Sequence, residues 1–239
     1  MMETKLISVQ RSHGCATLVL STGETLVMPR AMLKERPYRG GTPFDREAFD
    51  SFLLERSYPF AMEKAVALLA MRSRTQQEIA DALRKNAYPE RTIARVMARL
   101  DEAGYINDTD FAEQWAASRA TKGMGARRIR MELRQKGVDS EAIDEALSAI
   151  DHDDMLSGAL KAARKAASGK NLADPKDRQK IFAALARRGY GYAEARQALE
   201  SRWQWVSALA ATAGGTLTSK QKIKLEAYIQ MNYLDRILR

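Results

Sequence analysis

The residues that could do chemistry most directly lie at predicted helix starts in this sequence. The run from Asp151 to Asp154 contains three aspartates and a histidine, a set of side chains that could bind a metal ion. The run also precedes a helical pattern, and acidic side chains in a first turn complement the helix dipole. We therefore favour helix capping over metal binding, and capping also accounts for the pair Asp108 and Asp110.

Other groups for covalent or acid–base catalysis are sparse. The chain has two histidines, His13 and His152, and a single cysteine, Cys15. It contains no nucleophile elbow, phosphate-binding glycine loop or metal-ligand spacing. We therefore expect a protein that is not an enzyme and that needs no cofactor or metal ion. The catalytic alternative is a nuclease-like or metal-dependent enzyme that uses the acidic run and loses activity in Asp153→Ala.

Basic side chains give a stronger signal, because they gather on one face of predicted helices. Five of the ten residues from 127 to 136 are Lys or Arg. At about 100° per residue, Arg127, Arg130 and Arg134 cluster within about 60° of each other. Ile129 and Leu133 point the opposite way, so the helix is expected to bury its apolar side and expose a row of cations.

Two further basic groups are candidates for the same role. Lys176, Lys180 and Arg187 align within about 40° on a later predicted helix, opposite its apolar positions. The third candidate group follows the end of an earlier helix and consists of Arg72 and Arg74.

The charge balance of the whole chain agrees with a polyanionic partner. Lys and Arg number 39 against 30 Asp and Glu, a net charge of +9. Each basic face could follow phosphates, with binding that weakens with salt and ignores sequence, or could receive carboxylates of a partner protein. A solvated helical face without a partner is the remaining interpretation. Tyr190 and Tyr192, which lie beside glycines, could add stacking on bases.

The elements that position these side chains begin with a β-rich segment. Apolar and β-branched runs at 6–9, 16–20 and 25–28, interrupted by Thr22 to Glu24, predict a hairpin or a small three-stranded sheet. The Pro- and Gly-rich stretch 36–43 is expected to be a loop. Asp45 can then cap a short helix with Phe49, Phe52 and Leu53 on one face.

From about residue 60 the apolar pattern is helical. Thr75 to Glu78 forms a capping box in which Glu78 can bond back to the cap, and Gly104 is expected to end a helix in the left-handed conformation. The pattern then repeats. At an offset of 50, the residues Ile79, Leu83, Ala87, Ile93 and Leu100 recur as Ile129, Leu133, Gly137, Ile143 and Ile150. At a further offset of 52, the residues Ile129, Leu133, Gly137 and Leu147 recur as Ile181, Leu185, Gly189 and Leu199.

We therefore predict a mainly α fold of three tandem three-helix repeats forming an elongated array, with a small N-terminal β-hairpin or sheet and an extra C-terminal helix. The predicted segments are 1–43 (β-rich), 44–106 (short linker helix and first repeat), 107–150 (second repeat), 151–202 (third repeat) and 203–239 (C-terminal helical extension).

The same sequence indicates the cellular setting. A lone cysteine permits no internal disulfide, as expected for the reducing cytoplasm. The first residues have no signal-peptide pattern, and the apolar runs are too short to cross a membrane. Without a visible dimerisation seam, we expect a monomer.

Three blocks of the sequence resemble one protein family. Residues 64–79 (KAVALLAMRSRTQQEI), 104–112 (GYINDTDFA) and 125–137, with Ile129, Glu132, Leu133, Lys136 and Gly137, are similar in order and spacing to the RecX regulatory proteins. The resemblance covers about residues 58–200, and the β-rich start resembles an extension found in some members. Ala87 stands where the pattern leads us to expect glycine, which puts the local turn in doubt.

The resemblance implies a fold and a function. The fold is three tandem three-helix repeats. The function is negative regulation of RecA: binding in the groove of the RecA–single-stranded DNA filament and inhibition of its recombinase, ATPase and coprotease activities. Through these, such a protein regulates homologous recombination, DNA repair and the SOS response. On this view the basic faces contact RecA or DNA, single-stranded and possibly duplex.

Two other readings stay open. A helix-turn-helix DNA-binding regulator acting without RecA would also use short helices joined by glycine turns, and it predicts a dimer that prefers a duplex sequence. A helical adaptor with no nucleic-acid role predicts that no salt-sensitive DNA binding is found.

Overall fold

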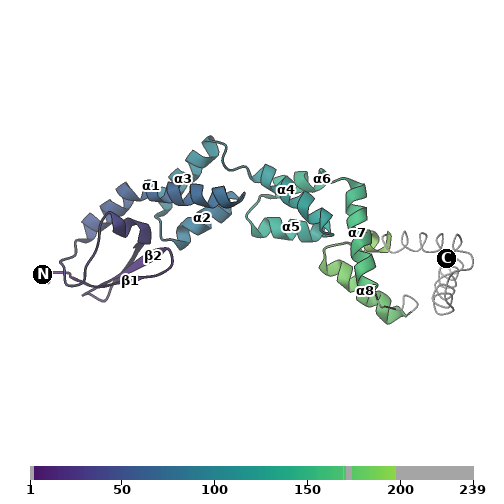
Figure 1. Ribbon diagram of the computed structural model, residues 1–239, viewed down its shortest axis with the longest axis horizontal. Helices are drawn as coiled ribbons and strands as arrows, with labels where there is room; N and C mark the ends of the chain where they lie inside the picture. The colour runs from purple at the N-terminus through teal and green to yellow at the C-terminus, as the bar shows by residue number, and fades with distance from the viewer. Residues whose placement is uncertain (1–2, 169, 171–173, 198–239) are drawn as a thin grey trace, which may run out of the picture. The chain divides into compact units, whose positions relative to one another are not determined.

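The structure, a computed structural model, describes residues 3–168, 170 and 174–197. The predicted C-terminal extension at 203–239 lies outside these residues. The chain forms two compact units, one of Met1–Phe111 with Lys136–Val138 and one of Ala112–Gln135 with Asp139–Arg239. The fold is mainly helical with a small N-terminal sheet, as predicted (Figure 1).

The sheet has three antiparallel strands in the order β1-β2-β3: β1 (Leu6–Arg11), β2 (Cys15–Leu20) and β3 (Thr25–Pro29). Alternate residues of β2 are buried, the pattern of a strand with one face on a core. The two connecting turns contain Gly14 and Gly23, whose φ angles are +98° and +82°, a region that glycine enters without steric cost.

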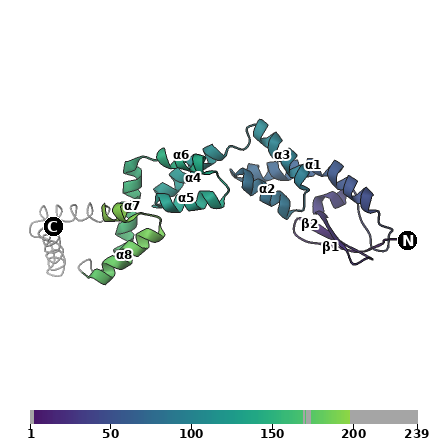
Figure 2. The ribbon, with the colours of Figure 1, turned by 180° about the vertical axis from the view of Figure 1, so that it is seen from behind.

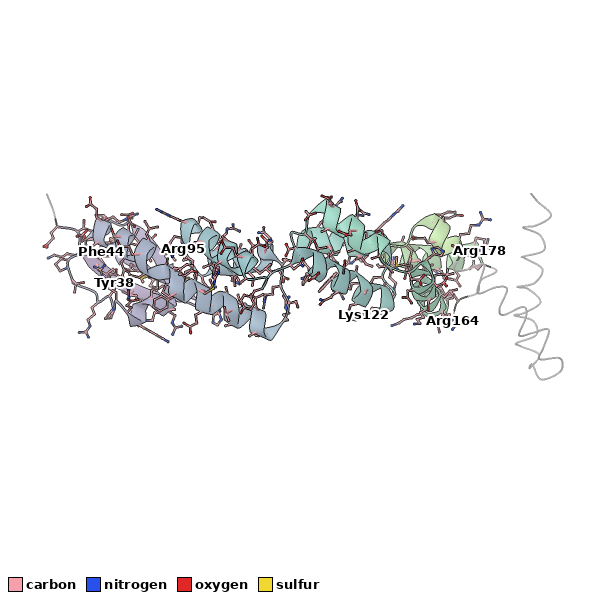
Figure 3. All side chains as sticks on the ribbon, turned by 90° about the horizontal axis from the view of Figure 1, so that it is seen from above. Tyr38, Phe44, Arg95, Lys122, Arg164 and Arg178 are labelled. Carbon is pink, nitrogen blue, oxygen red and sulfur yellow. The ribbon has the colours of Figure 1, made fainter. Side chains whose placement is uncertain are left out.

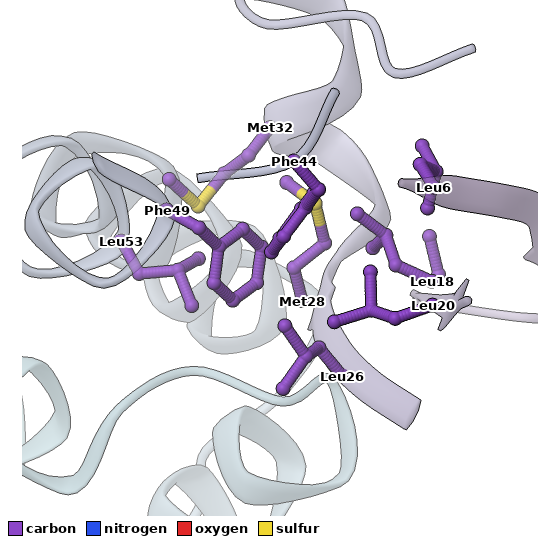
Figure 4. Close-up of a cluster of buried hydrophobic side chains, with 10 residues drawn as sticks. Leu6, Leu18, Leu20, Leu26, Met28, Met32, Phe44, Phe49 and Leu53 are labelled. Atoms are coloured by element: carbon purple, nitrogen blue, oxygen red, sulfur yellow. The ribbon is translucent and has the colours of Figure 1, made fainter. Parts of the chain in front are cut away.

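One face of the sheet packs against a 3-10 helix, η1 (Arg30–Lys34), and the first part of α1 (Arg46–Met71). Figure 4 shows the leucines of the strands meeting Met28, Met32 and two phenylalanines. The rings of Phe44 and Phe49 are 5.5 Å apart, a favourable tilted arrangement. A three-stranded sheet is marginal alone, so this helical cover is what stabilises it.

The sequence predicted a short helix here and a new helical pattern from about residue 60, and the predicted break between them was wrong. Asp45 does cap the helix, since its side chain accepts from the backbone N–H of Ala48, but α1 then runs unbroken through Pro59. A proline inside a helix removes one hydrogen bond. The helix continues because its two halves belong to different cores: Phe49 is buried beneath the sheet and Ala61 within the first repeat.

The first repeat consists of the second half of α1 with α2 (Gln76–Lys85) and α3 (Glu90–Glu102). Its apolar stripe is buried as predicted, with Ile79, Leu83 and Leu100 no more than 1% exposed. A buried hydrogen bond of 2.6 Å between the hydroxyls of Ser57 and Thr92 joins α1 to α3. The polar pair thus satisfies itself inside the core.

The later helices are α4 (Asp108–Thr121), α5 (Ala126–Gln135), α6 (Ser140–Ser148), α7 (His152–Ala166) and α8 (Pro175–Arg187), and residues 192–197 are helical. Ile129, Leu133, Ile143, Ile181 and Leu185 are fully buried, as the repeat pattern predicted. In both views α7 and α8 lie together (Figures 1 and 2), and their apolar sides share one core.

Corresponding turns of the three repeats share a left-handed residue. Gly137 and Gly189 have φ angles of +81° and +89°, and Ala87 adopts +61° at the equivalent position. The missing glycine therefore leaves the turn itself unchanged and places an alanine in a conformation that L-residues avoid. Gly104 ends α3 with φ +68°, as expected.

Candidate nucleic-acid interface

The position of α5 is set by the turn that follows α8. The backbone N–H of Gly125 donates to the carbonyl of Arg188 at 2.8 Å, and that of Arg127 to the carbonyl of Gly189 at 3.2 Å. A Cβ at Gly189 would lie 2.3 Å from the nitrogen of Arg128, so only glycine fits this approach. The start of α5 thereby has partners for N–H groups that a helix leaves unbonded.

A second side of α5 carries a partly buried charge cluster. Glu132 receives hydrogen bonds from Arg128 Nε at 3.0 Å and Trp115 Nε1 at 3.2 Å. Arg119 Nε lies 2.7 Å from the carboxylate, an ion pair whose angles are poor for a hydrogen bond. Burial opposes ionisation of Glu132, but these partners outweigh it and hold its pKa below the ordinary value.

The outer side of α5 is the candidate interface. Arg127, Arg130, Met131, Arg134 and Gln135 line an open hollow on this side. Arg127 and Arg134 are exposed, and within the described part of the chain neither forms an ion pair. Arg130 differs from the prediction in one respect, because it is half-buried and pairs with Asp144 of α6. The row therefore offers two unpaired cations and one shared cation.

The second predicted group is partly neutralised as well. Lys176 and Arg187 are exposed on α8, whereas Lys180 Nζ lies 3.0 Å from Asp177. Asp174 caps the helix, since its side chain accepts from the backbone N–H of Lys176. Like the outer side of α5, this face therefore has two exposed cations without an ion pair in the described residues and one paired cation.

The third predicted group is engaged inside the first unit. Arg72 binds Glu78 through two nitrogens, at 2.9 and 3.2 Å, and Arg74 Nε donates to the carbonyl of Leu68. Glu78 also pairs with Lys136 at 2.5 Å, so it does not bond back to the cap as the capping box predicted. Only the other half of the box forms, in which Thr75 Oγ1 accepts from Glu78 N.

Figure 3 labels further basic residues of the second unit that sequence reasoning did not select, among them Lys122, Arg164 and Arg178. Arg164 and Arg178 have partners of their own. Lys122 is exposed in the turn after α4. A cation outside a repeated helical position gives no periodic signal, so facial clustering could not find it.

The tyrosines divide between core and surface. Tyr190 is 2% exposed, so its predicted availability for stacking was wrong, and burial raises the pKa of its hydroxyl to about 12. Tyr192 is 71% exposed, and its ring stacks on Phe182 at 5.3 Å. Neighbouring tyrosines separated by one glycine gave no sequence signal to distinguish them.

Two of the acidic residues at helix starts, Asp108 and Asp151, have structural roles. Asp151 caps α7 by accepting from the backbone N–H of Asp153. Asn107 caps α4, and Asp108 accepts from the backbone N–H of Gln76 at the start of α2. Among the described residues no group of three His, Cys, Asp or Glu side chains could hold a metal ion. Over the same residues no helix has the length and apolarity to cross a membrane.

Comparisons with known proteins agree with the repeats. Family models for the first, second and third three-helix domains of RecX match residues 61–100, 107–147 and 153–199. The chain is similar to the regulatory protein RecX of Mycolicibacterium vanbaalenii, with 42% identity over 131 residues, 52% of this chain and 71% of the relative. The RecX of Amycolatopsis mediterranei is 37% identical over 138 residues, which cover 57% of this chain and 79% of that protein.

Two solved structures share the fold. A crystal structure of regulatory protein RecX has a TM-score of 0.57 at 21% identity and covers 82% of this chain and 99% of its own. The RecX structure from Lactobacillus salivarius has a TM-score of 0.55 at 23% identity and covers 61% of this chain and 96% of its own. From its repeats, its core and these matches, the chain belongs to the RecX family of regulatory proteins.

Proposed function

We propose that this chain is a non-enzymatic negative regulator of RecA. It binds the RecA–single-stranded DNA filament in the cytoplasm and lowers its recombinase, ATPase and coprotease activities, and so restrains DNA repair and the SOS response. Membership of a regulatory family supports the proposal, as does the resemblance of residues 104–112 and 125–137 to RecX proteins.

The observation that carries the proposal is the outer side of α5. Arg127 and Arg134 are exposed cations without an ion pair in the described residues, on a helix whose start is fixed by the turn after α8. A fixed row of guanidinium groups suits either phosphates or carboxylates, because each group presents a planar fork of donors. We propose that this row attaches the chain to the filament and that Lys176 and Arg187 extend the contact.

Inhibition then follows from occupancy of the filament. A chain of helical repeats attached along the groove would oppose the rearrangement of RecA subunits or the addition of new ones. Because the contacts are mainly electrostatic, the attachment weakens as salt rises.

The test is RecA ATP hydrolysis on single-stranded DNA, titrated with the full chain. Strong loss of hydrolysis far below one molecule per RecA would support capping or destabilisation of filaments. Loss only near equal amounts would favour occupancy of the groove. No loss at any ratio, with the chain folded and still binding DNA, would contradict the proposal and favour a DNA-binding regulator that acts without RecA.

A variant pair separates the proposed face from general charge. Arg127→Gln with Arg134→Gln is expected to raise the half-inhibitory concentration about tenfold or more, because two charge-assisted contacts are lost. The control is Arg91→Gln with Arg99→Gln, which removes the same charge from exposed positions of α3, where Arg99 forms a solvent-exposed ion pair with Glu102 at 3.5 Å. Equal effects of the two pairs would show that net charge, and not this face, causes binding.

A further inference from the structure

An exposed aromatic pair lies beside the arginine row. The rings of Phe182, on α8, and Tyr192, in the following helical segment, are stacked with centroids 5.3 Å apart and planes 19° apart. Tyr192 is 71% exposed, while Phe182 packs partly against the core of the third repeat. The inner ring therefore supports the outer one, and the outer face of Tyr192 is open to solvent.

The backbone holds this pair close to Arg127. The turn between the two aromatic residues carries Gly189 and Gly191, and Gly189 accepts the hydrogen bond from Arg127 N. A Cβ at Gly191 would lie 3.8 Å from Arg127 Nη2, so the guanidinium reaches the residue next to Tyr192. All these residues belong to the second unit. The first cation of the row thus lies beside the residue that precedes Tyr192 in the chain.

The acidic group nearest to the pair limits how a polyanion could lie there. Glu194 Oε2 accepts from the backbone N–H of Gly191 at 2.6 Å, which holds its carboxylate at the start of the helical segment. A Cβ at Gly191 would lie 3.5 Å from this carboxylate oxygen, so Glu194 and Arg127 both lie beside Gly191, and the carboxylate repels phosphates there. A strand would therefore keep its phosphates along α5 in the direction of Arg134 and turn its bases toward Tyr192.

We propose that the Phe182–Tyr192 stack is a base-stacking platform for single-stranded nucleic acid, with the phosphates along Arg127 and Arg134. The inference rests on the proposed function and specifies how this chain meets the DNA of the filament. Stacking on an aromatic ring tolerates any base and requires that the base be unpaired. The platform hence favours a single strand over a duplex without reading sequence.

The test measures binding of the full chain to a fluorescent oligothymidylate, an abasic strand of equal length and a duplex, by anisotropy at fixed salt. The unmodified chain is expected to bind oligothymidylate about 5- to 20-fold more tightly than the abasic strand, because only the first can stack. Tyr192→Ala should abolish this difference. Arg127→Gln should weaken binding to oligothymidylate and to the abasic strand by similar factors.

Two variants guard against a merely structural effect. Tyr192→Phe keeps the ring and should retain the preference for oligothymidylate. Tyr192→Trp adds a tryptophan whose fluorescence is obtained by subtracting that of the unmodified chain. Oligothymidylate should quench this fluorescence, and the abasic strand should not. The platform is rejected if the unmodified chain binds both strands equally or if Tyr192→Ala binds oligothymidylate as tightly as before.

ATP hydrolysis by RecA, measured in the presence of the same variants, distinguishes the two proposals. Loss of inhibition in Tyr192→Ala with unchanged affinity for oligothymidylate would assign Tyr192 to a protein contact and overturn the platform, while leaving regulation of RecA intact. Reduced affinity for oligothymidylate alone, in a chain that never inhibits RecA, would support the platform and contradict the proposed function.

Discussion

At the scale of single residues, Ala87 is the clearest strained position. It adopts φ +61° where the equivalent turns have Gly137 and Gly189. The left-handed region costs an alanine about 1 kcal/mol, which glycine avoids. We predict that Ala87→Gly raises the free energy of unfolding by about 0.5–1 kcal/mol, measured by urea denaturation.

The control for this prediction is the same substitution in a helix. Ala94 is an exposed residue of α3, where glycine costs backbone entropy. Ala94→Gly should therefore lower the free energy of unfolding by about 1 kcal/mol. If both variants are destabilised alike, the turn at Ala87 is not strained and the interpretation is wrong.

The ionisation of a single residue, Glu78, also makes the stability of the fold depend on pH. Burial opposes ionisation of Glu78, but its hydrogen bonds and charge interactions with Arg72 and Lys136 prevail and lower its pKa below 4.5. The folded state thus holds the proton less tightly than the unfolded state, so the stabilisation is full above about pH 4.5 and is lost as pH falls through the lowered pKa. We predict that Glu78→Gln reduces stability at pH 7 and flattens the decline measured between about pH 5 and pH 3.

The same glutamate-to-glutamine substitution at an exposed position tests this assignment. Glu102 is 68% exposed at the end of α3, and its ion pair with Arg99 at 3.5 Å is open to solvent, so Glu102→Gln should leave the acid limb of the stability curve almost unchanged. An unchanged acid limb in Glu78→Gln would assign that limb to other carboxylates.

At the scale of elements, α1 shows what sequence patterns can and cannot predict. Buried Ile and Leu at helical spacing identified α2, α3 and α5 because each covers a single core. The continuity of α1 was missed because its two halves serve two cores and Pro59 lies between them. Local signals favoured a break, and tertiary packing at both ends prevailed.

Pro59 gives a prediction at this scale. It is exposed within α1, where it removes a hydrogen bond, whereas Pro89 precedes the first residue of α3 and needs none. Pro59→Ala should restore the bond and raise the free energy of unfolding by about 1–3 kcal/mol, detected by circular dichroism during urea unfolding. Pro89→Ala should change it little. A loss of stability in Pro59→Ala would mean that α1 depends on the proline for its path.

At the scale of the whole molecule, the fold is easier to predict than the interface, and the reason is physical. The blocks that identify the family contain structural residues: Gly104 ends α3, Asn107 caps α4, and Glu132 is enclosed by Arg119, Arg128 and Trp115. A change at such a residue alters the fold itself, so these residues carry information about the fold. The exposed cations have no such constraint, and helical phase alone did not reveal that Asp144 pairs with Arg130.

Because the chain has a net charge of +9, the dependence of its DNA binding on salt concentration is a property of the whole molecule. Each phosphate contact on a single strand contributes about 0.7 to the slope of log affinity against log salt concentration. If Arg127 and Arg134 each contact one phosphate, their joint change to glutamine should make the slope shallower by about 1.4. The control pair Arg91→Gln and Arg99→Gln should keep the original slope, because a charge outside the proposed contact face alters the general field without releasing counterions at the strand. Equal slopes in all three proteins would place the phosphate contacts away from α5, and the exposed Lys176 and Arg187 of α8 would be the next residues to change.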